Sequence, residues 1–222
     1  NRPISQGLYD DSMEHDACGI GFVANIKGNK EHTIIQDGLK ILENLTHRGA
    51  VGSDPTIGDG AGLLLQIPDV FLRDECSKLG INLPQASKYA VAQIFMPSNM
   101  EKQKYCEEVF ENIVKDEGVI FLGWRKVPIK ESAVSNSVNS SAPEIRQAFI
   151  ASSEKNSNQD AFERKIFVIR KQFSNKLRAD ELLGKENSVY VCSMSSRTIN
   201  YKGMLLSDTV GSYFPDLLDK RV

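Results

Sequence analysis

The stretch Asp16-Ala17-Cys18-Gly19-Ile20-Gly21-Phe22 decides the fold of this chain, because it places a cysteine at the head of an apolar, strand-like run. The small residues around Cys18 leave its sulfur without bulky neighbours, and they let backbone N–H groups approach whatever the sulfur attacks. Residues 18–26 are therefore expected to form a strand that ends at the turn Lys27-Gly28-Asn29. On this stretch alone, the alternative that Cys18 is a small buried hydrophobe stays open.

Two glycine-containing segments follow, Leu45-Thr46-His47-Arg48-Gly49-Ala50 and Gly58-Asp59-Gly60-Ala61-Gly62. Residues 31–46 have helical apolar spacing, so His47 and Arg48 are expected to close a helix, with Gly49 as a left-handed C-cap. His47 has the right chemistry for a general base. Its place at a helix end has a simpler explanation, since a cation there stabilises the last carbonyls by about 0.3–1 kcal/mol. The second segment matches neither glycine-rich phosphate-binding pattern and also suits a tight turn into a strand.

In this order and spacing, the three segments resemble the amidotransferase domain of the glutamate synthase family. The resemblance extends to Gly123-Trp124-Arg125-Lys126-Val127-Pro128, to residues 197–204 and to Tyr213-Phe214-Pro215-Asp216-Leu217. It therefore covers nearly the whole chain, with a divergent middle.

The resemblance implies an α+β fold, the αββα sandwich of N-terminal-nucleophile hydrolases. It implies that residues 1–17 are a propeptide and that residues 18–222 belong to a class II glutamine amidotransferase domain. Cys18 is then the catalytic nucleophile, and its α-amino group, freed by cleavage, is the base; an α-amine pKa of about 7.7–8.0 suits that task. Arg48 is expected to position the nucleophile or the pocket loops, and Gly49, Asp59 and Gly60 to line the substrate pocket.

The sequence departs from the family at the substrate site. The family builds its oxyanion hole from an Asn-Gly pair and holds the glutamine α-carboxylate with an Arg-Phe-Ser-Thr segment, and the chain contains neither an Asn-Gly nor an Arg-Phe dipeptide. In the family both follow the Tyr-Phe-Pro-Asp-Leu region, so they are expected beyond Val222. The fold is accordingly expected to be incomplete at its C-terminal end, and the chain by itself to be inactive.

For the parent enzyme, the resemblance implies that L-glutamine is hydrolysed through a glutamyl thioester. The ammonia would pass to a synthase domain of the same polypeptide, which forms glutamate from 2-oxoglutarate. That domain implies FMN, an iron–sulfur cluster and NADH, NADPH or ferredoxin as electron donor, with no cofactor expected in this chain. A homo-oligomer is expected for the full enzyme.

Composition narrows the possible partners. Lys and Arg number 27 against 29 Asp and Glu, for a net charge of −2, which argues against nucleic acid as a partner. No apolar run approaches the ~20 residues of a membrane span, so no membrane partner is expected. The four cysteines, at positions 18, 76, 106 and 192, have no zinc-site spacing, so no metal is expected. No secretory signal is visible, which indicates the cytoplasm, or a plastid or other organelle if a transit peptide has been removed.

The rest of the chain is expected to mix strands and helices. Cys76, Cys106 and Cys192 are interpreted as packing residues. Residues 129–159 are rich in Ser and Asn and are expected to form a long loop or insertion. We expect helices at 68–80, 99–117 and 207–213, and strands at 63–67, 89–96, 119–127, 166–171, 188–194 and 197–202.

Two alternatives remain open. One is an amide hydrolase of the same fold with another substrate, because the residues that would select glutamine are missing. The other is an unprocessed, non-catalytic interaction module of that fold.

Overall fold

The computed structural model describes residues 18–52, 54–153, 158–178, 180–183 and 189–222. Its helices are α1 (His32–Asn44), α2 (Asp69–Lys78), α3 (Met100–Asp116), α4 (Asn136–Ser141), α5 (Gln159–Arg178) and α6 (Val210–Tyr213). Short 3₁₀ turns are η2 (Thr46–Arg48), η3 (Glu131–Ala133) and η4 (Pro215–Leu218). The strands are β1 (Ala61–Gln66), β2 (Tyr89–Met96), β3 (Ile120–Lys126), β4 (Glu144–Ala151), β5 (Tyr190–Ser195) and β6 (Thr198–Gly203).

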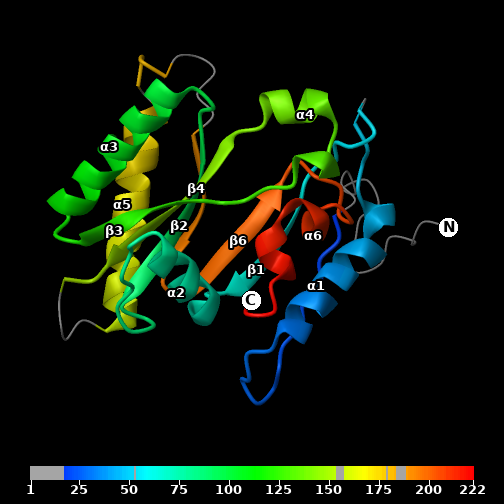
Figure 1. Cartoon of the computed structure of the whole chain (residues 1–222), viewed down its shortest axis with the longest axis horizontal. Coiled ribbons are helices and arrows are strands. Elements are labelled where there is room, and N and C mark those ends of the chain that lie inside the picture. The colour runs from blue at the N-terminus through cyan, green and yellow to red at the C-terminus, as the bar shows by residue number, and fades with distance from the viewer. Residues whose placement is uncertain (1–17, 53, 154–157, 179, 184–188) are drawn as a thin grey trace, which may run out of the picture.

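The strands form two antiparallel sheets. One has four strands in the order β3-β4-β2-β5, and the other pairs β1 with β6, with Leu63 opposite Tyr201 and Leu65 opposite Ile199. Figure 1 shows α3 and α5 together on one side of the larger sheet, with β6, β1, α6 and α1 on the other. This mixture of helices and antiparallel sheets confirms the α+β class.

Alternation along β2 divides the interior into two cores, since successive side chains of a strand point to opposite faces. Ala92 and Ile94 face α3 and α5, where the rings of Phe110 and Phe173 meet edge to face with their centroids 5.2 Å apart. Val91, on the other face of β2, belongs to the core that α2, α6 and the smaller sheet share. Both faces of the larger sheet are therefore covered.

Most of the expected helices and strands are confirmed within a few residues. Helix α3 is capped by Asn99, whose side-chain oxygen accepts hydrogen bonds from the backbone N–H groups of Glu101 and Lys102. The strand expected at 188–194 is β5, although residue 188 lies outside the described residues. Of the helices in the described ranges, none has the length and apolarity needed to cross a bilayer.

The strand expected at residues 18–26 is wrong. In the structure this segment forms no ladder with a strand, and its side chains include some of the most exposed apolar groups, Ile20 at 97% and Phe22 at 91%. The segment runs along α1: a Cβ at Gly19 would lie 2.9 Å from Leu45 Cδ2, and one at Gly21 would lie 2.6 Å from Ile41 Cγ2. Its glycines therefore make room for the side chains of a helix, which offers no ladder of hydrogen bonds to a neighbouring strand.

The strand expected at residues 166–171 is also wrong, because these residues lie within the 20-residue helix α5. The local apolar run is strand-like, but the buried side chains recur every three or four residues over the whole helix and form one face. Those buried residues are Phe162, Ile166, Ile169, Phe173 and Leu177.

The long loop expected at residues 129–159 is wrong in its second half. Strand β4 lies there, between β2 and β3, and its last five residues are buried. Before it, η3 and α4 contain the Ser- and Asn-rich part of the segment. Residues 154–157 lie outside the described residues. The polar composition therefore belongs to a short helix and not to the whole segment.

The C-cap expected at Gly49 differs as well. Helix α1 ends at Asn44, and the 3₁₀ turn η2 follows it before Gly49. Gly49 has φ −94° and ψ 147°, which is extended backbone open to any residue.

A buried ion pair joins the two sheets. Arg125, at the end of β3, donates from Nη1 and Nη2 to the two carboxylate oxygens of Asp216 in η4, both at 2.8 Å. The Tyr201 hydroxyl donates to Asp216 Oδ2 at 2.9 Å, and Arg125 Nη1 also donates to Gln147 Oε1 at 2.9 Å. Gln147 in turn donates to Gln93 Oε1 on β2 at 3.0 Å. Burial, followed by the Asp216 charge, raises the pKa of Tyr201 well above its usual value, so the hydroxyl remains a donor.

Replacing Arg125 with methionine should lower the free energy of unfolding by about 3–5 kcal/mol, because Asp216 would remain buried without its cation. Lys126→Met is the matched control on the same strand: the Lys126 side chain is 63% exposed and pairs with Glu144, so its loss should cost less than ~1 kcal/mol. Urea denaturation followed by the fluorescence of Trp124, the single tryptophan, measures both. Equal losses in the two variants would contradict this role for the buried pair.

Candidate active site

Cys18 lies beside the end of α1. It is exposed, and its carbonyl oxygen accepts a hydrogen bond from Arg48 Nη2 at 3.5 Å. Arg48 belongs to the turn η2, whose geometry is set by the hydrogen bond from its own N–H to Leu45 O at 2.8 Å. The structure therefore brings together the predicted nucleophile and the arginine expected to position it.

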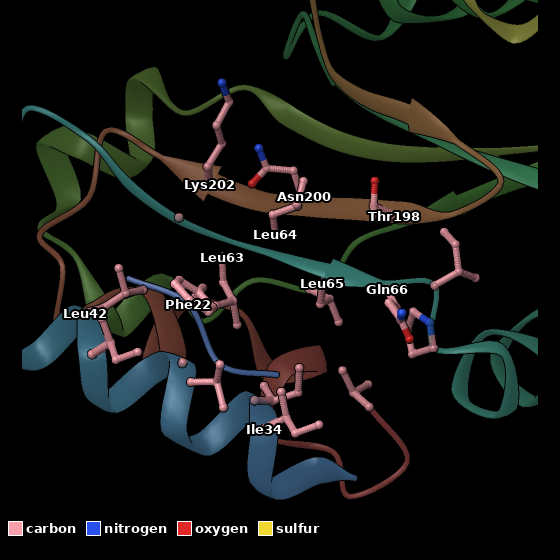
Figure 2. A pocket seen from close by; sticks show the side chains of 18 of the residues that line it. Phe22, Ile34, Leu42, Leu63, Leu64, Leu65, Gln66, Thr198, Asn200 and Lys202 are labelled. Carbon is pink, nitrogen blue, oxygen red and sulfur yellow. The ribbon is translucent and has the colours of Figure 1, made fainter. Parts of the chain in front are cut away.

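The residues that follow Cys18 line a large pocket. Its volume is about 1450 Å³, and its walls come from α1, β1, β6 and residues 19–25. Figure 2 shows Leu63 and Leu65 directed from β1 toward α1. On the other side of the strands the figure shows Thr198, Asn200 and Lys202. The wall between α1 and β1 is thus apolar, and the polar side chains of β6 lie apart from it.

His47 occupies the last turn of the α1–η2 segment. Its Nδ1 lies 3.0 Å from the carbonyl oxygen of Asn44, the last residue of α1, and the side chain is exposed. This contact agrees with the interpretation that His47 interacts with the last carbonyl groups of the helix.

Residues 50–52 and 57–59 pair as a hairpin that brings the other predicted pocket residues together. Gly52 N–H donates to Ile57 O at 2.9 Å, and Asp59 N–H donates to Ala50 O at 3.3 Å. A Cβ at Gly49 would lie 3.6 Å from Asp59 Oδ1, so Gly49 and Asp59 are neighbours at the base of the hairpin. Gly60 follows directly, and the base adjoins Arg48.

The backbone geometry at Gly58 and at Gly60 explains why glycine stands at these positions. A Cβ at Gly58 would lie 2.5 Å from the carbonyl oxygen of Leu205, so only glycine allows this approach. Gly60 has φ +123°, a conformation that residues with a side chain rarely adopt. The hairpin is thereby pressed against the segment after β6.

The sequence reasoning missed a cluster around Asp54 at the tip of this hairpin. Asp54 Oδ2 accepts hydrogen bonds from the hydroxyls of Ser135 at 2.6 Å and Ser137 at 2.7 Å. Asp54 Oδ1 accepts from Thr56 N at 2.8 Å and Thr56 Oγ1 at 2.6 Å. The Ser135 hydroxyl, followed by those of Thr56 and Ser137, lowers the pKa of Asp54 well below its usual range. Asp, Pro and Thr in succession are typical of a turn, but nothing in this pattern points to the distant serines.

The other three cysteines are buried, which confirms that they are packing residues. Burial raises the pKa of Cys76 to about 12 and the pKa values of Cys106 and Cys192 to about 11. Among the residues whose placement is given, no three His, Cys, Asp or Glu side chains gather into a group that could hold a metal ion.

The model of the family described as glutamine amidotransferases class-II matches residues 18–222. This chain belongs to the family of class II glutamine amidotransferases. Its match begins at Cys18, the residue that Arg48 contacts.

Several curated proteins are similar to this amidotransferase chain. The large chain of glutamate synthase [NADPH] from Bacillus subtilis is 43% identical over 218 residues, or 98% of this chain. Glutamate synthase [NADH] from Saccharomyces cerevisiae is 38% identical over 97% of the chain. The chloroplastic ferredoxin-dependent glutamate synthase of Oryza sativa subsp. japonica is 36% identical over 92% of it. The chain spans only 14%, 10% and 12%, respectively, of the lengths of these relatives.

At pH 7.5, iodoacetamide should modify Cys18 quickly and the other three cysteines slowly, since a thiolate is the reactive form and buried thiols are both inaccessible and protonated. Peptide mass spectrometry of the native chain checks this, and the denatured chain, in which all four cysteines should react, is the control. Fast labelling of the Cys18→Ser variant would show that a buried cysteine is reactive.

Proposed function

We propose that this chain is the amidotransferase part of a glutamate synthase and that Cys18 is its nucleophile. The observation that carries the proposal is the placement of Cys18. It is the exposed cysteine among four, it opens the segment matched by the family, and its carbonyl is held by Arg48. The glutamate synthases named above support the choice of parent enzyme.

In the proposed reaction the Cys18 sulfur attacks the side-chain amide carbon of L-glutamine. The thiol proton passes to the α-amino group of Cys18, which then protonates the leaving nitrogen, so that the C–N bond breaks and ammonia departs. Water hydrolyses the glutamyl thioester and releases glutamate. Residues 1–17 are, in this proposal, a propeptide whose removal creates the α-amine. While Ala17 remains attached, the nitrogen of Cys18 is an amide without basicity.

Arg48, Gly49, Asp59 and Gly60 are proposed to shape the pocket around the sulfur. The hydrogen bond from Arg48 fixes the backbone orientation of Cys18. The hairpin base, where Gly49 adjoins Asp59, supplies the neighbouring wall, and the close contact of Gly58 with Leu205 limits its movement.

The ammonia is proposed to reach a synthase domain of the same polypeptide, which makes glutamate from 2-oxoglutarate. The names of the relatives give NADPH, NADH and ferredoxin as electron donors, and the family resemblance adds FMN and an iron–sulfur cluster in that domain. A homo-oligomer is proposed for the full enzyme. The compartment is proposed to be the cytoplasm, with a plastid as the alternative that the chloroplastic relative supports.

Replacing Cys18 with alanine in the full polypeptide should lower the rate of ammonia release from glutamine by on the order of 10³-fold or more, because no other group can form the thioester. The melting temperature should stay nearly unchanged, since the side chain is exposed. Ammonia release measured with a coupled assay, and melting measured in parallel, test this.

Cys192→Ser is the matched control, because serine also offers a donor to Asn200 O, which the Cys192 thiol approaches at 3.2 Å. This variant should keep its activity. Unchanged ammonia release in the Cys18 variant would rule out the proposed function. A wild type that hydrolyses a different amide would favour the related amide hydrolase, and a wild type without any hydrolase activity would favour the interaction module.

A further inference from the structure

The hairpin, in which residues 50–52 pair with residues 57–59, is attached at both ends. Its base adjoins the η2 turn, where Arg48 contacts the Cys18 carbonyl. Its tip turns at residues 54–57, closed by the hydrogen bond from Ile57 N–H to Asp54 O at 3.0 Å. Between tip and base, Val51 and Gly58 form an antiparallel bridge. Because these hydrogen bonds join the tip to the base, a displacement of the tip should also displace the base.

The tip is held by what we call the Asp54 latch, formed by Asp54, Thr56, Ser135 and Ser137. Besides the hydroxyl contacts to the carboxylate, Ser135 N–H donates to Thr56 Oγ1 at 3.2 Å. Ser135 Oγ and Ser137 Oγ also lie 2.8 Å apart. The latch thus joins the hairpin to the start of α4, about 80 residues along the chain, with bonds to both the carboxylate and the neighbouring threonine.

The latch depends on the negative charge of Asp54. Each carboxylate oxygen accepts two hydrogen bonds, one set from Thr56 and the other from the two serines. Hydrogen bonds to an ionised acceptor are about twice as strong as neutral ones, and an amide in place of the carboxylate would turn one acceptor into a donor. Alanine at position 54 would remove the acceptor that the hydroxyls of Ser135 and Ser137 share.

We propose that Asp54 is a positioning residue for the amidotransferase site: its carboxylate fixes the hairpin tip to the start of α4 and so sets the place of the hairpin base beside Cys18. This inference rests on the proposed function, since it assigns Asp54 to the pocket in which Cys18 acts. Asp54 itself touches Thr56 and the serines, and acts through the hairpin.

The test uses the full polypeptide with the variants Asp54→Ala and Ser137→Ala. The value of kcat/KM for glutamine should fall about tenfold or more in Asp54→Ala and less in Ser137→Ala, because small displacements in a positioned site have large effects on rate. Ser137→Thr keeps the hydroxyl and should restore the wild-type value to within about threefold. Ser140→Ala is the matched control on the same helix, since Ser140 Oγ bonds Ser137 O, a backbone oxygen outside the latch.

A second measurement separates positioning from general stability. In Asp54→Ala, an electrophilic glutamine analogue should label Cys18 about tenfold more slowly, whereas labelling by iodoacetamide, which needs no pocket, should stay within about twofold. Wild-type kcat/KM in Asp54→Ala, an equal loss in Ser140→Ala, or equal slowing of both reagents would overturn the proposal.

The two hypotheses fail in different ways. If the wild type releases no ammonia from glutamine, the proposed function is wrong whatever Asp54 does. Hydrogen exchange at the amides of Gly52, Ile57 and Asp59 then tests the latch by itself. Exchange should accelerate at these amides in Asp54→Ala, and unchanged exchange would show that Asp54 does not hold the hairpin.

Discussion

The ion pair between Arg125 and Asp216 is the interaction on which the rest of the structure depends. Both side chains are nearly inaccessible to water, with exposed fractions of 6% and 3%. A buried charge is tolerated only when its partner and its remaining hydrogen-bonding groups are in place. Arg125 Cζ lies 5.3 Å from the ring centre of Phe71 on α2, and Tyr201 and Gln147 complete the hydrogen bonds. The pair thus fixes β3, β4, β6, α2 and η4 relative to one another.

The position of the hairpin near Cys18 depends on that ion pair. Tyr201, which donates to Asp216, lies on β6, and β6 pairs with β1 from Ala61 onward. Just beyond β6, Leu205 supplies the carbonyl oxygen that Gly58 approaches. The hairpin base, Arg48 and Cys18 then follow in a continuous series of contacts. The proposed chemistry at an exposed sulfur therefore rests on a charge pair buried between the sheets.

The sequence predicts a helix or strand correctly where the residues of that element themselves carry the pattern. Helix α3 has its cap at Asn99, and β2 is a run of apolar residues interrupted only by Gln93. Residues 166–171 of helix α5 resemble a strand because they begin with four adjacent apolar residues. The helical spacing of the buried face becomes visible only over the whole helix. The central strand β4 was missed because serines and asparagines before it gave the whole segment a polar character. A strand at residues 18–26 was expected from composition, but pairing requires a partner backbone that sequence pattern does not reveal.

Residues of the candidate site could be predicted from the sequence only within the segments that resemble the family. Cys18 and Arg48 are 30 residues apart, and the resemblance alone joined them before the structure did. Arg125 and Asp216 stood in two segments that carried the resemblance, yet a separation of 91 residues left their pairing invisible. Asp54 and Ser137 are 83 residues apart, and Ser137 lies in the segment that was expected to be a loop. Long-range polar contacts of this kind depend on the assembled fold, so local sequence pattern gives no sign of them.

The central claim is that Cys18 works with its own α-amino group as the base. The measurement that tests this most directly is the N-terminus of the catalytically active full polypeptide, determined by intact mass and N-terminal sequencing. The account predicts that the active enzyme begins at Cys18, with residues 1–17 removed. An enzyme that releases ammonia from glutamine at full rate while Ala17 remains bonded to Cys18 would contradict it.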